Sequence, residues 1–393
     1  MDATAHRVGV ADILRRFGST YRATHALSAT RAKVWRALVA CRTAALGGHL
    51  EACDSCGSMR LVYHSCRNRH CPLCQTRAKE AWLAQRQREL LPVPYFHLVF
   101  TLPHDLNQLI GQQPRAIYDV LFAAVSATLT EFAANPRWLG GTPAFSLILH
   151  TWKQDLGRHV HLHALVAGGA LAADGQWIAA RRGFLFPVHA LSRVFRGKFV
   201  AALAHARATT LRDVATLADA PWRALRARLH AHAWVVYAKQ PLGGPEQVLA
   251  YLGRYTHRVA ISNERIVAID RDEVVFRVRA DPATGSKRSV RLDGATFIAR
   301  FLLHVLPNGF KRIRHYGLLA ARHKAQRLAA ARQALAAPPP DPAVIESVAQ
   351  FMQRVAHIDA TACPHCGNGH FVVIGVLAPR AASGTSARGP PCV

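Results

Sequence analysis

Residues 159–163 read His-Val-His-Leu-His, a strict alternation of imidazole and branched apolar side chains. This alternation predicts a β-strand, because side chains two residues apart lie on the same face of a strand. His159, His161 and His163 would then share one face, with Val160 and Leu162 turned toward a core. Neutral imidazole is a common metal ligand. The run therefore predicts a metal-binding face on a sheet.

The charge of the chain predicts a polyanionic partner. Fifty Lys and Arg stand against 23 Asp and Glu, a formal net charge of +27 over 393 residues. Such an excess is typical of proteins that bind nucleic acid, because neutralising phosphates releases counterions. No run approaches the ~18 apolar residues that a membrane span requires, and the N-terminus lacks the pattern of a secretion signal. We therefore expect nucleic acid as partner, no membrane, and a cytoplasmic location.

Length and apolar periodicity predict the fold class. A chain of this length exceeds the usual single domain, and half of its residues are apolar. Three strands are expected, at residues 95–102, 144–154 and 159–168. Helices are expected at residues 114–134 and 188–232, and the prolines at 338–340 predict a linker. Strands joined in hairpins and mixed with helices indicate an α+β fold.

Two C-x-x-C pairs predict a zinc site. Clustered cysteines in a protein that is not secreted favour metal over disulfides. The spacing of the pairs predicts four thiolates at one tetrahedral zinc ion, from Cys53, Cys56, Cys71 and Cys74. Four nearby side chains are alternatives that replace a thiolate or help to hold a second ion: His49, Cys66, His70 and, further away, Cys41.

Two further features surround these cysteines or repeat their pattern. Arg67 and Arg69 lie among the ligands and predict a DNA contact face by their charge. Cys363 and Cys366 form a third pair near the C-terminus. With two thiolates, that pair needs a further ligand, and His370, Cys392 or a distant partner are the candidates.

Tyr251 and Tyr255 lie four residues apart, so they share one face of a predicted helix. Arg254 and Arg258 make this helix too polar for a core and are candidate DNA contacts. A tyrosine phenolate can attack a DNA phosphodiester and form a covalent phosphotyrosine that retains the energy of the bond for rejoining.

A divalent cation, held by two imidazoles and one further ligand, would polarise the phosphate under attack. We expect Mg²⁺ or Mn²⁺, for which an amide oxygen is a suitable ligand. Gln154 is favoured as this third ligand because it precedes the histidine run across a predicted hairpin at residues 155–158. Gln247, on the tyrosine helix, is the alternative.

Four blocks of the sequence resemble the IS91-type transposases of bacterial insertion sequences, a branch of the HUH endonucleases. The blocks are residues 41–49 with 65–72, residues 150–152 with 159–169, residues 251–263, and residues 300–319. The chain has Val160 where the family usually has Pro and Ala164 where Cys is common, and neither change removes a ligand.

The resemblance implies an N-terminal zinc-binding domain and a catalytic domain, and with the C-terminal tail we expect three consecutive parts of the chain. These are a helical and zinc-binding domain at 1–91, an HUH-type catalytic domain with an antiparallel sheet at 92–320, and a basic helical tail at 321–393. It implies His161 and His163 as the metal-binding pair, although spacing alone leaves His159 with His161 open. It also implies Tyr251 and Tyr255 as the nucleophiles.

The implied enzyme is a metal-dependent tyrosine endonuclease and strand transferase. It would act on single-stranded DNA through a 5′-phosphotyrosine during rolling-circle-like transposition, in association with the bacterial nucleoid. Structural zinc and catalytic Mg²⁺ or Mn²⁺ are the implied cofactors. The alternatives are a rolling-circle replication initiator or relaxase, a non-catalytic zinc-dependent DNA-binding protein, and a metal-dependent hydrolase.

Overall fold

A computed structural model describes residues 8–181, 183, 185–242, 247–248, 253, 260–280, 284–340, 350, 352–354 and 359–380. The chain forms two compact units, each assembled from separate stretches of sequence. Unit 1 comprises Met1–Ala78, Ile261–Ala299 and Pro342–Val393, and unit 2 comprises Lys79–Ala260 and Arg300–Asp341. This division differs from the expected succession of three domains, because the C-terminal segment joins the unit that contains the N-terminus.

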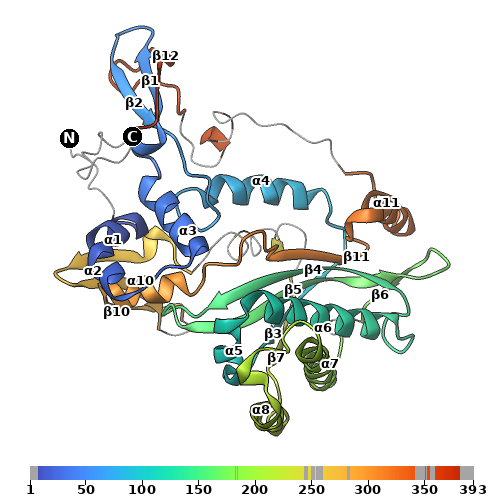
Figure 1. Cartoon of the computed structure of the whole chain (residues 1–393). Coiled ribbons are helices and arrows are strands. Elements are labelled where there is room, and N and C mark those ends of the chain that lie inside the picture. The colour runs from blue at the N-terminus through green and yellow to red at the C-terminus, as the bar shows by residue number, and fades with distance from the viewer. Residues whose placement is uncertain are drawn as a thin grey trace. The chain divides into compact units, whose positions relative to one another are not determined.

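Unit 2 is built on a six-stranded antiparallel sheet in which the histidine run is a central strand (Figure 1). The strand order is β11-β4-β5-β3-β7, and β6 pairs with β5. The strands are β3 (Tyr95–Thr101), β4 (Thr142–Trp152), β5 (Arg158–Leu171), β6 (Trp177–Ala179), β7 (Val236–Leu242) and β11 (Ile313–Gly317). The three strands expected from the sequence are therefore confirmed as β3, β4 and β5.

Helices cover one face of this sheet. The long helices are α6 (Pro114–Ala134) and α7 (Val188–Ala208), with the shorter α5 (Asn107–Gln112) and α8 (Asp219–Ala231) beside them (Figure 1). The expected helix at 114–134 is confirmed as α6, and the stretch at 188–232 divides into α7 and α8. Two more helices belong wholly or mainly to this unit, α4 (Gln75–Gln87) and α11 (Lys324–Ala334).

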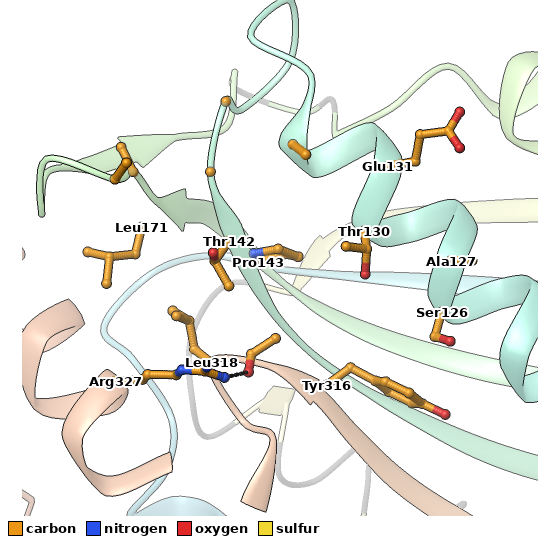
Figure 2. A pocket seen from close by; sticks show the side chains of 16 residues that line it. Ser126, Ala127, Thr130, Glu131, Thr142, Pro143, Leu171, Tyr316, Leu318 and Arg327 are labelled. Atoms are coloured by element: carbon orange, nitrogen blue, oxygen red, sulfur yellow. Dashed lines mark hydrogen bonds between the residues drawn. The ribbon is translucent and has the colours of Figure 1, made fainter. Parts of the chain in front are cut away.

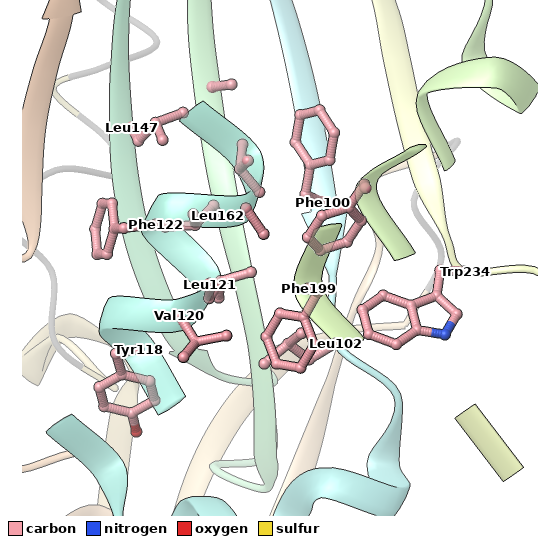
Figure 3. Packing of buried hydrophobic residues seen from close by; sticks show 14 of the residues in the cluster. Phe100, Leu102, Tyr118, Val120, Leu121, Phe122, Leu147, Leu162, Phe199 and Trp234 are labelled. Carbon is pink, nitrogen blue, oxygen red and sulfur yellow. The ribbon is translucent and has the colours of Figure 1, made fainter. Parts of the chain in front are cut away.

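The main hydrophobic core lies between the sheet and these helices. Strand residues of one parity face it, among them Phe100, Leu147 and Leu162, while α7 contributes Phe199 (Figure 3). The rings of Phe199 and Trp234 lie 5.2 Å apart, edge to face. Because neighbouring side chains of a strand alternate between faces, this packing turns the imidazoles of β5 to the other side of the sheet.

Helix α6 is, among the described residues, the one helix long and apolar enough to cross a membrane by length and composition. Its buried residues, such as Leu121, Phe122 and Val125, belong to the core of unit 2. Burial in that core accounts for its apolar character.

Unit 1 contains two three-stranded antiparallel sheets and a group of N-terminal helices. The helices are α1 (Val10–Arg16), α2 (Gly18–Thr24) and α3 (Ala29–Ala40). The first sheet, in the order β12-β1-β2, consists of β1 (Gly48–Cys53), β2 (Met59–Tyr63) and β12 (Phe371–Leu377). The second, in the order β10-β9-β8, consists of β8 (Ile266–Asp270), β9 (Glu273–Arg279) and β10 (Lys287–Asp293), followed by α10 (Gly294–Leu302). Both units combine helices with antiparallel sheets, which confirms the α+β class.

A buried histidine of unit 2 holds the turn between β4 and β5. His304 donates from Nε2 to the carbonyl of Leu156 at 2.9 Å, and its Nδ1 accepts from the Thr151 hydroxyl at 3.1 Å. Leu156 has a φ of 65°, in the left-handed region that is costly for a branched side chain. The hydrogen bonds from His304 therefore fix a strained turn immediately before the histidine strand.

Burial lowers the pKa of His304 from its ordinary value of 6.5 to about 4. In the unfolded chain the His304 imidazole is protonated below about pH 6.5, whereas in the folded chain it is protonated only below about pH 4. Acidification between these two values therefore favours unfolding. We expect this group to reduce the free energy of unfolding by about 2 kcal/mol between pH 7 and pH 5. Urea unfolding at both pH values should show this loss in the wild type and a smaller loss in His304→Gln. An identical pH dependence in the two proteins would contradict the prediction.

Candidate functional site

Three imidazoles meet on the face of the unit 2 sheet opposite to the one that packs against α6 and α7. His150 comes from β4, and His161 and His163 come from β5. The antiparallel register places His150 directly opposite His161. One ligand nitrogen from each of the three residues lies within 4.8 Å of the others. The β4–β5 hairpin therefore builds the cluster by itself.

Hydrogen bonding sets the direction of the nitrogen lone pairs. His161 donates from Nδ1 to the carbonyl of His159 at 3.1 Å, which leaves its Nε2 without a proton when the ring is neutral. This Nε2 lies 3.1 Å from Nε2 of His163, which in turn lies 3.0 Å from Nδ1 of His150. Burial lowers the pKa of His161 to about 4, so the ring is neutral at pH 7.

The spacing of these nitrogens suits a shared cation. Two ligands at right angles around one ion, each about 2.1 Å from it, are about 3 Å apart. Imidazoles that converge at this distance, on a buried sheet face, have the donor chemistry of a three-histidine metal site. Among the described residues, these three histidines are the one group of imidazoles whose nitrogens lie close enough to share an ion.

The cluster contains some of the cation ligands that the sequence suggested and leaves out others. It contains His161 and His163, whereas the Nδ1 atom of His159 points elsewhere, buried and with no hydrogen-bond partner. Gln154 is exposed on the turn beyond Trp152, the last paired residue of β4, and Gln247 is also exposed. The third nitrogen comes instead from His150. Gln154, the third ligand expected from sequence, lies on the turn after β4, whereas the strand register places His150 opposite His161.

A fourth histidine supports the cluster from β3. His97 is buried, and its Nε2 lies 2.8 Å from Nδ1 of His163, with the two rings stacked. When Nδ1 of His163 donates this hydrogen bond, the lone pair of the neutral ring is on Nε2, the atom that lies among the cluster nitrogens. Hydrogen bonds of this kind orient a ligand ring and fix its tautomer.

We expect His97→Ala to weaken Mn²⁺ binding by about 10- to 100-fold. The measurement is calorimetric titration of the full chain with Mn²⁺. His189→Ala, which removes an exposed imidazole from α7, serves as the matched control and should leave the affinity unchanged. Equal affinities for the wild type and His97→Ala would contradict this orienting role.

The predicted nucleophiles and two predicted DNA contacts lie outside the described residues: Tyr251, Tyr255, Arg254 and Arg258. Residues next to them are described. Val248 is buried among apolar side chains that include Ile148 and Leu165. Each of these two lies two positions from a cluster histidine on its own strand and so shares the imidazole face. The segment that leads to Tyr251 thus starts on that face.

The eight described cysteines form two clusters of four in unit 1 and no disulfide. The first cluster consists of Cys41, Cys66, Cys71 and Cys74, and the second of Cys53, Cys56, Cys363 and Cys366. In the first cluster, neighbouring sulfurs are 3.5–3.7 Å apart. Four sulfurs about 2.3 Å from one zinc ion lie about 3.8 Å from each other, so this spacing fits a tetrahedral site.

The clusters correct the expected zinc ligands. Cys53, Cys56, Cys71 and Cys74 do not meet at one point, because the two C-x-x-C pairs belong to different clusters. Cys66 and Cys41 join Cys71 and Cys74 in the first cluster. Cys41 was the alternative ligand furthest from the others in sequence. His49 and His70 instead face Glu51 and Asn68, at 2.9 and 3.0 Å.

A groove of about 850 Å³ at one edge of unit 2 contains none of the predicted site residues. It lies beside the start of β4 and the end of β11, with Thr130, Thr142, Tyr316 and Arg327 among the lining side chains (Figure 2). Arg327 donates to the carbonyl of Gly317 at 3.2 Å. The candidate chemistry of the chain therefore lies at the histidine cluster and not in this groove.

Comparison with known proteins identifies the family. Residues 144–327 match the family described as putative transposase, and residues 13–102 match the transposase zinc-binding domain. The putative transposase y4qJ of Sinorhizobium fredii is 45% identical over 379 residues, covering 94% of this chain and 95% of the relative. The chain belongs to the IS91-type transposases. The transposase for insertion sequence element IS801 of Pseudomonas savastanoi pv. phaseolicola is 27% identical over 336 residues, covering 84% and 80% of the two chains.

The matched regions of this transposase contain the histidine cluster and the first cysteine cluster. The putative-transposase match includes the β4–β5 hairpin and all three cluster histidines. The zinc-binding match includes the first cysteine cluster, and together they support structural zinc. Arg67 and Arg69, beside Cys66, have exposed side chains. Cys363 and Cys366 lie outside both matches.

Proposed function

We propose that this transposase cleaves and rejoins single-stranded DNA through a covalent 5′-phosphotyrosine, as an endonuclease of the HUH type. The observation that carries the proposal is the convergence of three imidazole nitrogens at about 3 Å spacing on the sheet face opposite to α6 and α7. His150, His161 and His163 would hold Mg²⁺ or Mn²⁺. When bound, such an ion polarises a phosphate and stabilises the charge that develops on its oxygens.

Tyr251 and Tyr255 supply the nucleophile in this proposal. The phenolate oxygen of one tyrosine forms a bond to phosphorus, the bond from phosphorus to the 3′ oxygen breaks, and that oxygen leaves as a hydroxyl after taking up a proton. The 5′ end stays attached to the enzyme, and a later attack by a 3′-hydroxyl releases the tyrosine and joins the strands. Two tyrosines allow two such attacks without release of DNA.

The basic side chains fit the same substrate. Phenol ionises near pH 10 when unperturbed, so nearby guanidinium groups such as Arg254 and Arg258 favour the phenolate and contact the DNA backbone. Arg67 and Arg69 would add contacts from the zinc-binding domain. The net charge of +27 supports a DNA partner, and we place the protein in the bacterial cytoplasm at the nucleoid.

Burial of Val248 with Ile148 and Leu165 supports the pairing of tyrosines and histidines. It anchors the chain three residues before Tyr251 to the face that bears the cluster.

The test is formation of a protein–DNA adduct that resists denaturant. Labelled single strands covering both ends of the element that carries the gene are incubated with the full chain and Mn²⁺. We expect an adduct in the wild type and none in the double variant Tyr251→Phe/Tyr255→Phe. Tyr237→Phe, at an exposed tyrosine of β7, is the matched control and should form the adduct.

Three results would overturn the proposal. An adduct that persists in the double variant would assign the nucleophile to another residue. Cleavage without any adduct would indicate a metal-dependent hydrolase. Binding of the strands with neither cleavage nor adduct would indicate a non-catalytic zinc-dependent DNA-binding protein.

A further inference from the structure

The second cysteine cluster joins two parts of the chain that are about three hundred residues apart in sequence. Cys53 is the last residue of β1 and Cys56 follows it, whereas Cys363 and Cys366 precede β12. The Sγ atoms of Cys53 and Cys366 lie 3.7 Å apart, as do those of Cys56 and Cys363. A disulfide requires about 2.05 Å, whereas thiolates around one zinc ion are about 3.8 Å apart. The spacing thus fits a shared ion.

The two halves of this cluster have the same local geometry. Each pair is followed by a glycine in the left-handed region, Gly57 with φ 71° and Gly367 with φ 73°. In each half, backbone N–H groups point at a sulfur: Cys56 donates to Cys53 at 3.5 Å, and Gly369 donates to Cys366 at 3.4 Å. Such N–H donors stabilise a thiolate over a thiol. In each half, the backbone of the loop is thus folded around a cysteine sulfur.

The halves are also fitted closely to each other. A Cβ atom at position 369 would lie 2.4 Å from Sγ of Cys53, so only glycine allows this approach. Asp54 accepts the N–H of His370 with its carboxylate at 2.7 Å and donates its own N–H to the carbonyl of His370 at 3.0 Å. Backbone contacts therefore hold the Cys53 loop and the segment around Gly369 close together.

Little apolar burial is available to hold β12 in place. Strand β12 pairs with β1 along its length, yet Val372, Val373, Ile374 and Val376 are exposed, the last of them by 84%. The buried cluster beneath this sheet is small and consists of Cys53, Cys363 and Phe371, with Cys366 packed against it. A sheet with so small a core needs another source of stability, and metal binding is the usual one.

We propose that Cys53, Cys56, Cys363 and Cys366 bind a second structural zinc ion that fastens the segment 359–380 to β1. The first zinc ion lies within the matched zinc-binding domain, whereas half of this second site lies beyond it. The ion makes β12 a permanent strand of unit 1. The proposal is independent of the proposed nuclease chemistry, because none of its ligands belongs to the histidine cluster or the tyrosine segment.

The experiment is zinc counting by native mass spectrometry of the full chain, with amide hydrogen exchange on the same samples. We expect two zinc ions per wild-type chain and one in Cys363→Ser/Cys366→Ser. In the variant, amides of residues 371–377 should exchange at least tenfold faster. Cys392→Ser is the matched cysteine control and should retain two ions.

A second variant separates ligand loss from the fit of the two halves. Gly369→Ala keeps every cysteine but places a methyl group against Cys53, so it should also lose the second ion. One zinc ion in the wild type, or two in Cys363→Ser/Cys366→Ser, would overturn the proposal. Failure of the tyrosine adduct assay would leave these counts unchanged, so the two proposals fail separately.

Discussion

Replacing His150 with alanine is expected to lower the rate of single-strand cleavage by about 10³-fold and to abolish measurable Mn²⁺ binding. A metal ion contributes several kcal/mol to a phosphoryl-transfer transition state, and about 1.4 kcal/mol corresponds to a factor of ten in rate. Loss of about 4 kcal/mol gives the expected factor. Single-turnover cleavage with saturating Mn²⁺ is the measurement, together with calorimetric titration. His161→Ala and His163→Ala should behave alike.

Three matched variants make this prediction specific. Gln154→Ala and Gln247→Ala remove the two glutamines that the sequence offers as ligands, and both side chains are exposed. His159→Ala removes an imidazole from the same strand and the same face, outside the cluster. All three should retain cleavage within about threefold of the wild type. A large loss in Gln154→Ala with none in His150→Ala would restore the glutamine as the third ligand.

Phe199→Ala should reduce the free energy of unfolding by about 3–5 kcal/mol, because truncation of a fully buried aromatic ring loses apolar burial and leaves a cavity. Phe199 is completely buried, and its ring lies 5.2 Å from that of Trp234 (Figure 3). The ring of Phe195 lies 6.3 Å away on the same helix, and all three residues belong to the main core of unit 2. Thermal unfolding followed by circular dichroism should show a fall in Tm of about 10 °C, since each kcal/mol shifts a unit of this size by about 2–4 °C.

Val235→Ala is the control for this variant. Val235 lies next to Trp234 in sequence, but 62% of its surface is exposed, so its truncation should change stability by less than about 0.5 kcal/mol. A loss below about 1 kcal/mol in Phe199→Ala would show that the ring does not fill a close-packed core. Destabilisation of equal size in both variants would point to a local effect on the start of β7.

The sequence was sufficient to predict elements that depend on local pattern. Alternation of side chains located β5, an apolar aromatic run located β3, and amphipathic spacing located α6. The chemical character of the sheet face could also be predicted, because parity along one strand fixes which side chains share a face.

The exact members of the histidine and cysteine clusters could not be predicted. They depend on the register of a hairpin and on pairing between strands that are far apart in sequence. His150 enters the cluster through its position opposite His161, and a shift of one residue in the hairpin would have turned it to the core. Cys53 and Cys71 separate because β1 pairs with a strand from the other end of the chain. The C-x-x-C spacing marks each half of a site but carries no information about which halves combine.

The pairing of β1 with β12 also has a consequence for the order in which the protein is made. Strand β1 ends at Cys53, and its partner begins at Phe371. Ribosomes add about 5–20 residues per second, so one side of β1 waits for tens of seconds with its backbone N–H and C=O groups unpaired. An open strand edge of this kind invites association with other chains. A gene copy interrupted between the codons for β2 and those for β12 would make that exposure permanent, and its product would be prone to aggregate rather than merely to lack a tail.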